Sequence, residues 1–325
     1  MVAQTFGPPH PSIAVSQVSA QDEPTREGAL FLLLPNGAQG VGLGRAMTTM
    51  VSSEAAFWNP AGLAGLESSR VLLMRGEHLG GEATGLSALW RRDGGSAFGF
   101  SYQLLDQGTQ DATDGEGNVR GSIVFRNHQA LLSAATSLGS RARVGITTKV
   151  VMERTTCRGD CGGILDRGVT ATGYAVDFGL QGRPLQDHPL EVGAMVAHAG
   201  PRFRVEGAEQ SDPLPTRLRL GVAYDVLYGL MPDEDVEMKV VLEGEDRLLE
   251  PGNGSAYLGA EFTAGTQDRV FLRGGYVFSG NPTDGAALGF GFQYERFEFG
   301  FARALARGGL TSGDEPVHVT LALIL

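Results

Sequence analysis

Apolar and polar residues alternate in short segments along most of the chain after residue 68. In one segment Phe98, Phe100 and Tyr102 share one face, whereas Ser101 and Gln103 share the other. About fourteen such segments follow one another, and a period of two sustained over this length predicts β-strands rather than helices. Other clear examples lie at residues 143–153, 217–225, 236–243, 287–294 and 317–325.

One face of these segments is nearly free of charge, and the other carries charged residues on strand after strand. About fourteen strands close a barrel too wide for side chains to fill, so an apolar lumen would leave a large void. We therefore predict an all-β fold, a transmembrane antiparallel up-and-down β-barrel with its apolar face towards lipid and its polar face towards the lumen. The predicted lumen-lining charges are Arg217, Arg219, Glu237, Lys239, Glu243, Glu261, Arg273 and Glu298.

The links between the predicted strands alternate in length. Short links lie near residues 93–95, 138–140, 183–188, 228–234, 265–268 and 294–296, and long ones at 107–120, 157–168, 201–215 and 305–314. Short turns at one rim and long loops at the other are typical of bacterial outer-membrane barrels. In the fourth and sixth strands the apolar and polar residues separate less cleanly into two faces. In the fourth, Leu131 and Leu132 are adjacent and would therefore point to opposite faces.

A block of different character precedes the strands. An apolar lead-in at residues 31–35 is followed by closely spaced glycines, by a small-residue stretch at 46–56 suited to a short helix, and by Trp58 with the tetrad Asn59-Pro60-Ala61-Gly62. A segment that folds into a barrel has to be compact and rich in small residues, as this one is. We predict a leader or disordered segment at 1–27, a plug at 28–67 and an outer-membrane barrel at 68–325.

This order of elements resembles the PorV/PorQ family of outer-membrane barrels, relatives of the FadL-type fatty-acid transporters that include a component of the type IX secretion system. The residues that carry the resemblance are Gly37, Gly42, Gly44, Trp58, Asn59, Pro60, Ala61 and Gly62. The resemblance implies a plug in the lumen, with the tetrad where the plug meets the first strand. The alternative is that these residues only hold a turn. The chain has Val51-Ser52-Ser53-Glu54 where the family commonly has an acidic pair, so a role for such a pair is not implied.

Composition limits the function classes. Gly contributes 48 of the 325 residues, which suits many tight turns and closely packed strands. The formal net charge of −11 argues against nucleic acid as a partner, because phosphate binding needs a basic face. No run of about 18 apolar residues is present, which leaves no transmembrane helix. The first 27 residues lack the basic start and apolar core of a secretory signal, so a cytoplasmic location stays open beside the outer membrane of a Gram-negative-type bacterium.

Both cysteines, Cys157 and Cys161, fall in a predicted surface loop. A disulfide between them would close that loop and suits an oxidising compartment, whereas free thiols or a metal site are the alternatives. The stretch from Asp111 to Asn118 clusters oxygen ligands around a glycine turn, and either a solvated hairpin tip or a Ca²⁺ loop would fit.

Nothing in the sequence indicates an enzyme or a bound cofactor. The run from Gly40 to Arg45 lacks the last glycine of a dinucleotide-binding motif and has no βαβ context. No serine, cysteine or threonine has a recognisable nucleophile setting.

Three functional hypotheses remain. As the resemblance implies, the barrel is an accessory or shuttle of protein secretion whose long-loop rim docks a translocon or a secreted cargo domain. In the second hypothesis it transports long-chain fatty acids or other hydrophobic compounds, which apolar loop residues at 164–165 and 248–249 would capture. In the third it is a structural barrel of a surface assembly. The partners are accordingly outer-membrane lipid, secretion proteins or a hydrophobic small molecule.

Overall fold

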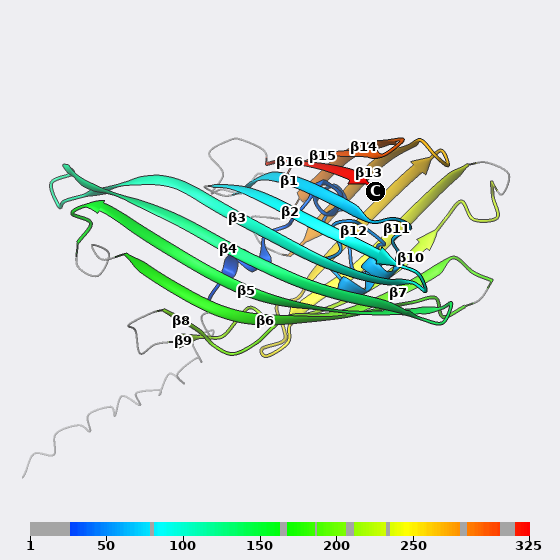
Figure 1. Ribbon diagram of the computed structural model, residues 1–325, viewed down its shortest axis with the longest axis horizontal. Coiled ribbons are helices and arrows are strands. Elements are labelled where there is room, and N and C mark those ends of the chain that lie inside the picture. Colours follow the sequence, from blue (N-terminus) through cyan, green and yellow to red (C-terminus); the bar gives the residue numbers. More distant parts are fainter. Residues whose placement is uncertain are drawn as a thin grey trace, which may run out of the picture.

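Fourteen antiparallel strands form one closed barrel (Figure 1). The computed structural model describes residues 27–78, 81–162, 168–185, 187–205, 211–231, 235–279, 285–305 and 316–325. The barrel strands are β1 (Arg70–His78), β2 (Gly81–Arg92), β3 (Ser96–Thr113), β4 (Val119–Leu138), β5 (Ala142–Gly159), β6 (Val169–Gly182), β7 (Leu190–Ala199), β10 (Arg217–Asp225), β11 (Val236–Arg247), β12 (Ser255–Ala264), β13 (Arg269–Phe278), β14 (Gly285–Tyr294), β15 (Phe297–Ala304) and β16 (Val317–Ile324). In the link from β7 to β10, the short strand β8 (Phe203–Val205) pairs with β6, and β9 (Ser211–Asp212) pairs with β8.

The first and last strands close the barrel. β1 pairs with β2 on one side and with β16 on the other, where Arg70 lies opposite Ile324. Closure leaves the barrel wall without free edges and places the start of β1 and the end of β16 at one rim. That rim, here called the short-turn rim, also holds the tight links at 93–95, 139–141, 265–268 and 295–296. The predicted closed antiparallel barrel is confirmed.

Side chains on the strands alternate between the outer surface and the lumen. Phe98 and Phe100 on β3 are exposed outside, whereas Ser101 and Gln103 are buried inside. The two adjacent leucines of β4 follow the same rule: Leu132 is 63% exposed on the outer surface, and Leu131 is fully buried in the lumen among apolar residues of the N-terminal block. That block explains why an apolar side chain occurs on the polar face.

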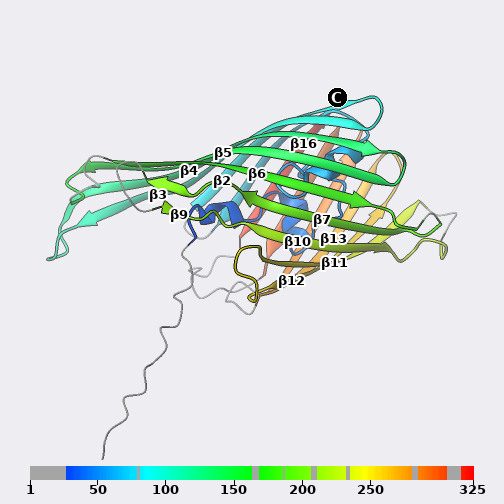
Figure 2. The ribbon, with the colours of Figure 1, turned by 90° about the horizontal axis from the view of Figure 1, so that it is seen from below.

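Two of the predicted long loops are wrong in extent. β3 continues to Thr113 and β4 begins at Val119, so only residues 114–118 form the link predicted at 107–120. Cys157 likewise lies within β5 rather than in a loop. β3 and β4 stay paired beyond a bulge after Asp106. The polar residues that indicated a loop belong to these paired strands, where the strands extend past the apolar outer surface of the barrel. β3, β4 and β5 therefore project beyond the rest of the barrel (Figures 1 and 2).

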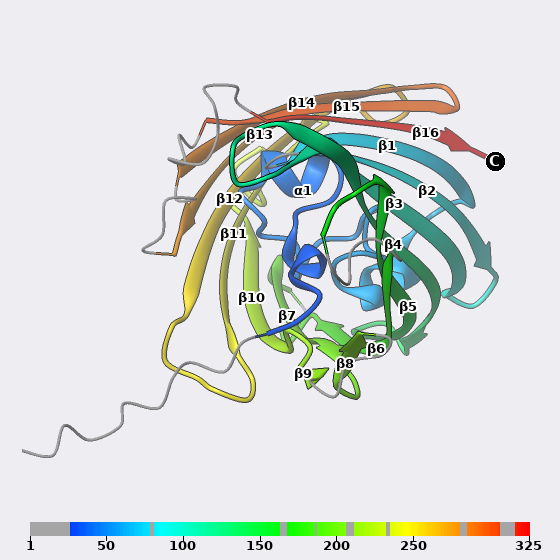
Figure 3. The same cartoon turned by 90° about the vertical axis from the view of Figure 1, so that its left-hand side faces the viewer.

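Residues 28–66, here called the luminal segment, run inside the barrel (Figure 3). They contain short 3₁₀ helices at Leu30–Leu33 and Pro60–Gly65 and one five-residue helix, α1 (Ala38–Gly42). The predicted helix at 46–56 is wrong: this stretch forms successive turns, closed by bonds such as that from the Met50 amide to the Met47 carbonyl. Side chains of the wall bind the Thr48 amide and carbonyl, which a helix would have paired within itself. None of the helices in the described residues is long and apolar enough to cross a membrane. Nearly all of the predicted leader, together with Ile164 and Leu165, lies outside the described residues.

The orientation of the wall leads to a stability prediction. Replacing Leu132 by arginine places a charge in the middle of the outward apolar surface, and we expect it to lower the free energy of unfolding by about 2–4 kcal/mol in lipid vesicles. Denaturant titration of the folded barrel in vesicles measures the change. The control is Val124→Arg, which lies farther along the same face of β4 and beyond the apolar level; equal losses from both variants would contradict the orientation.

Candidate functional site

The luminal segment passes from one rim of the barrel to the other. At its start the Gly28 amide donates to the Pro213 carbonyl, next to β10 at the long-loop rim (2.9 Å). At its end Leu66 precedes β1, which begins at the short-turn rim. The segment therefore stands across any path through the lumen, and its contacts with the wall decide whether that path can open.

Glu54 is the first anchor of the segment. Its carboxylate is buried and accepts hydrogen bonds from the backbone amides of Gln39 (3.1 Å) and Gly40 (3.0 Å), and from the Thr320 hydroxyl on β16 (2.8 Å). A Cβ atom at Gly37 would lie 2.0 Å from this carboxylate carbon, and Gly37 also has a φ of +81°. Glycine is needed there both for space and for backbone conformation. Glu54 thus ties the start of α1 to the barrel wall.

Glu243 on β11 is the second anchor. One of its oxygens accepts from the Thr48 amide (2.8 Å) and the other from the Thr48 hydroxyl (2.7 Å). The same carboxylate pairs with Arg219 on β10. A predicted lumen-lining charge therefore binds the luminal segment directly instead of facing open water.

The tetrad packs against the wall at the point where the segment leaves the lumen. The Asn59 side-chain amide donates to the Thr48 carbonyl (2.7 Å), and its oxygen accepts from the Ala61 amide (3.1 Å). A Cβ atom at Gly179 on β6 would lie 1.9 Å from that oxygen, and one at Gly145 on β5 would lie 2.4 Å from the Pro60 carbonyl carbon. The wall is thus built of glycine where the tetrad touches it.

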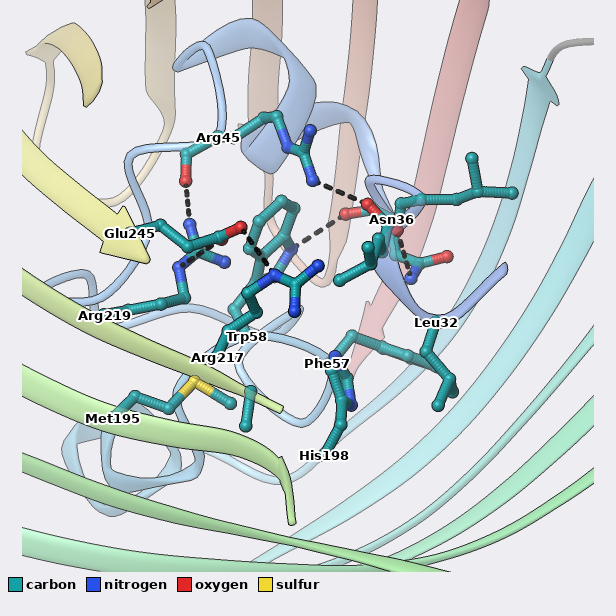
Figure 4. A pocket seen from close by; sticks show the side chains of 13 residues that line it. Leu32, Asn36, Arg45, Phe57, Trp58, Met195, His198, Arg217, Arg219 and Glu245 are labelled. Atoms are coloured by element: carbon teal, nitrogen blue, oxygen red, sulfur yellow. Dashed lines mark hydrogen bonds and ion pairs between the residues drawn. The ribbon is translucent and has the colours of Figure 1, made fainter. Parts of the chain in front are cut away.

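Trp58 joins the two halves of the segment. Its indole N–H donates to the Asn36 carbonyl (2.9 Å), and the Arg219 guanidinium lies 5.1 Å from the centre of its ring (Figure 4). Around it lies a small cavity that Phe57, Met195 and His198 also line (Figure 4). Its volume of about 20 Å³ is enough for about one water molecule. In this conformation no room exists beside Trp58 for a larger molecule.

Larger spaces lie on either side of the segment. A cavity of about 600 Å³ near the long-loop rim, here called the upper cavity, is lined by Leu33, Arg45, Arg217, Asp246 and Tyr257 among others. A cavity of about 200 Å³ near the short-turn rim, here called the lower cavity, is lined by further lumen residues including Gln39, Ser52, Glu237, Arg273 and Glu298. The luminal segment separates these two spaces.

The predicted lumen-lining charges mostly occur in ion pairs. Arg217 pairs with Glu27 (2.7 Å), Arg273 with Glu261 (2.5 Å), Lys239 with Glu237 (3.2 Å) and Glu298 with Arg70 (2.6 Å). The glycines carried by the resemblance are also in close contact: a Cβ at Gly42 would meet Gly289 at 3.1 Å, and one at Gly44 would meet the Tyr276 amide at 2.5 Å. Ala61 and Gly62 are buried in the 3₁₀ helix that follows Asn59.

Sequence reasoning missed two parts of the interior. Glu54 was given no role, because it stood alone where an acidic pair was expected, although its position in a block of small residues was a usable signal. The other part is a buried cluster on three strands, in which Lys149 pairs with Asp177 (2.7 Å) and Asp177 also accepts from the His198 amide (2.8 Å). These residues meet at the register shift between β6 and β7, which strand periodicity alone does not reveal.

The projecting strands hold the remaining candidates. Cys157 and Cys161 form a disulfide beside the end of β5. At the tip of the β3–β4 hairpin, Asp114 accepts from the Asn118 amide (2.9 Å) and from Arg120 (2.7 Å), and these bonds hold the pKa of its carboxyl below the ordinary value. Its oxygens are thus already occupied. The described residues contain no group of three or more histidine, cysteine or acidic side chains placed to hold a metal ion.

No protein-family model matches the chain, and no curated protein matches it in sequence. Solved structures match it in fold. A CymD monoaromatic hydrocarbon channel gives a TM-score of 0.60 at 14% identity, over 90% of this chain and 98% of that chain. The Ralstonia pickettii toluene transporter TbuX gives 0.54 at 12% identity, over 88% and 96%, and a Pseudomonas aeruginosa FadL homologue gives 0.55 at 10%, over 89% and 98%.

The chain has the fold of these FadL-type barrels. The expected relation to the FadL-like architecture is confirmed at the level of fold, whereas no match supports the narrower PorV/PorQ family. The likeness extends over nearly the whole length of each protein. At these identities it establishes the architecture, and the use of the barrel has to be argued from its interior.

The anchoring role of Glu54 can be tested by proteolysis. In Glu54→Ala two backbone amides and one hydroxyl lose their acceptor, at a cost of roughly 1–3 kcal/mol each, so the segment should loosen. We expect trypsin to cleave the folded barrel after Arg45, which lies inside the lumen in the wild type with the following Ala46 fully buried, and mass spectrometry identifies the fragments. Glu67→Ala removes an exposed carboxylate just outside the segment and serves as the control. Unchanged resistance in Glu54→Ala would show that the anchor is dispensable.

Proposed function

We propose that the protein is an outer-membrane channel for small hydrophobic compounds, of FadL type, without catalytic activity. The observation that carries this proposal is the luminal segment, which separates an upper cavity from a lower one. A barrel that served only as a scaffold would not need two cavities on either side of a segment held by side-chain hydrogen bonds. The fold supports the proposal, because the hydrocarbon channel and the toluene transporter share it over nearly their whole length.

The long-loop rim suits the capture step, because Leu248 and Leu249 are exposed there, directly after β11. The upper cavity below them is lined mostly by polar and charged groups such as Arg45 and Asp246, with Leu33 among its few apolar ones. A hydrophobic molecule that reaches this rim thus meets apolar groups before the polar wall. Passage to the lower cavity then requires the luminal segment to move, since the space beside Trp58 is too small.

A cross-link tests whether the segment moves. A Cβ atom at Gly300 on β15 would lie 3.2 Å from the Cβ of Ala38, close to the separation found in disulfides, and no backbone atom comes nearer, so Ala38→Cys with Gly300→Cys should join segment and wall. In cells that contain the oxidised double variant, we expect uptake of labelled toluene and labelled oleate to fall to the level of cells without the protein. Reduction with dithiothreitol should restore uptake.

Two controls complete this experiment. Ala38→Cys alone should transport like the wild type, and wild type treated with dithiothreitol accounts for reduction of the native disulfide. Full uptake through the oxidised double variant would rule out passage by movement of the segment. Absence of uptake by the wild type for both compounds would count against the channel itself.

A second function, docking of secretion partners, is favoured by one observation. β3, β4 and β5 project as a continuous sheet beyond the rim, and the Cys157–Cys161 disulfide braces the end of β5 (Figure 2). Such a sheet offers a surface that passage through the lumen does not require. Comparison of secreted proteins with and without the gene tests this function, and an unchanged set of secreted proteins would exclude it.

A further inference from the structure

The outward surface of β3 to β6 carries a pair of arginines at the border of its apolar area. Strand register arranges the outward side chains in rows. One row consists of Tyr102, Ala130, Val150 and Tyr174, and the next of Leu104, His128, Met152 and Thr172. The row after that consists of Asp106, Arg126, Arg154 and Thr170. The surface therefore changes from apolar to charged within two rows.

The height of this charged row follows from strand geometry. On β4 the outward rows without acidic, lysine or arginine side chains extend from Leu138, at the short-turn rim, to His128. About ten residues at roughly 3.4 Å each span about 34 Å along the strand, and a tilt of about 40° reduces this to about 26 Å across the membrane. The apolar band of outer-membrane barrels is about 25 Å tall. Arg126 and Arg154 thus stand at the level where lipid headgroups begin on the long-loop side.

The charges in this row are not balanced. Arg126 and Arg154 lie directly opposite each other on neighbouring strands, an arrangement that repulsion disfavours. Arg126 donates to Asp106 (2.8 Å), whereas Arg154 makes no ion pair with any residue that the structure describes. Arg158 follows on the same face of β5, and Asp111 lies two strands away, on β3. An anion between the two arginines would remove the repulsion.

We infer that Arg126 and Arg154 bind the phosphate group of an anionic lipid headgroup in the leaflet at the long-loop rim. Guanidinium groups bind phosphate oxygens through pairs of charge-assisted hydrogen bonds, and the lipid tail would lie along Tyr102 and Val150 below. The site is separate from the lumen and from the transported compound. It rests on the proposed function only in taking the barrel to lie in the outer membrane with this rim outward.

The test uses the whole protein in lipid nanodiscs. Discs of phosphatidylcholine with a small fraction of diphosphoryl lipid A are dissolved in mild detergent, and mass spectrometry counts the lipid A retained by each barrel. We expect the wild type to retain lipid A and the double variant Arg126→Gln with Arg154→Gln to bind it about tenfold more weakly, which corresponds to about 1.4 kcal/mol. Retention should also fall at high salt.

The control is Arg75→Gln, which removes an outward arginine of β1 near the same rim that already pairs with Glu82. It should retain lipid A like the wild type. Circular dichroism and insertion into discs establish that each variant is folded. Equal retention by the double variant and the wild type, or no retention by an inserted wild type, would overturn the inference. Failure of the wild type to insert would instead overturn the membrane location on which both proposals depend.

Discussion

The side chains of the barrel wall cannot fill the lumen, and the luminal segment occupies part of the remaining space. The irregular backbone of this segment therefore needs hydrogen-bond partners inside the barrel. About fourteen strands enclose more space than their inward side chains occupy. The segment fills part of it, but its turns satisfy only some of its amides and carbonyls, and the remaining buried ones need partners. Glu54 and Glu243 accept from the amides of residues 39, 40 and 48, while Asn59 and Gln181 donate to the carbonyls of 48 and 50. Much of the interior chemistry serves this requirement.

The same requirement shapes the wall. Where backbone of the segment approaches backbone of a strand, the strand has glycine: Gly145 faces Pro60, Gly193 faces Thr48, and Gly275 faces Gly44. At these contacts backbone meets backbone, so no side chain could move aside to make room for the segment to shift. The carboxylate bonds, in contrast, can be exchanged for water at modest net cost. A path through the barrel therefore depends on residues that hold the segment by hydrogen bonds and not on the strands themselves.

The barrel could be predicted from sequence because each strand by itself shows the alternation of apolar and polar residues. The distribution of charge between the two faces then indicates which face meets lipid. Leu131 looked out of place only because its apolar partners come from another part of the chain. The projecting strands were read as loops, since beyond the lipid level the alternation of Thr109 to Thr113 becomes polar on both faces. The position of Glu54 among small residues was a usable signal, but its partner on the wall was out of reach, because Thr320 lies at the opposite end of the sequence.

The charge balance of the lumen bears on the proposed transport function. The chain as a whole has a formal net charge of −11, yet the inward charges largely cancel in pairs such as Arg217 with Glu27, Arg273 with Glu261 and Lys149 with Asp177. A pore that attracts ions of one sign needs an excess of the opposite charge along its wall. A wall whose positive and negative charges cancel produces little net electrostatic potential in the pore. The interior therefore offers little to attract a simple ion of either charge. The proposed passage of uncharged, hydrophobic compounds agrees with this balance, and under that proposal selection would fall to the rim, where Leu248 and Leu249 are exposed.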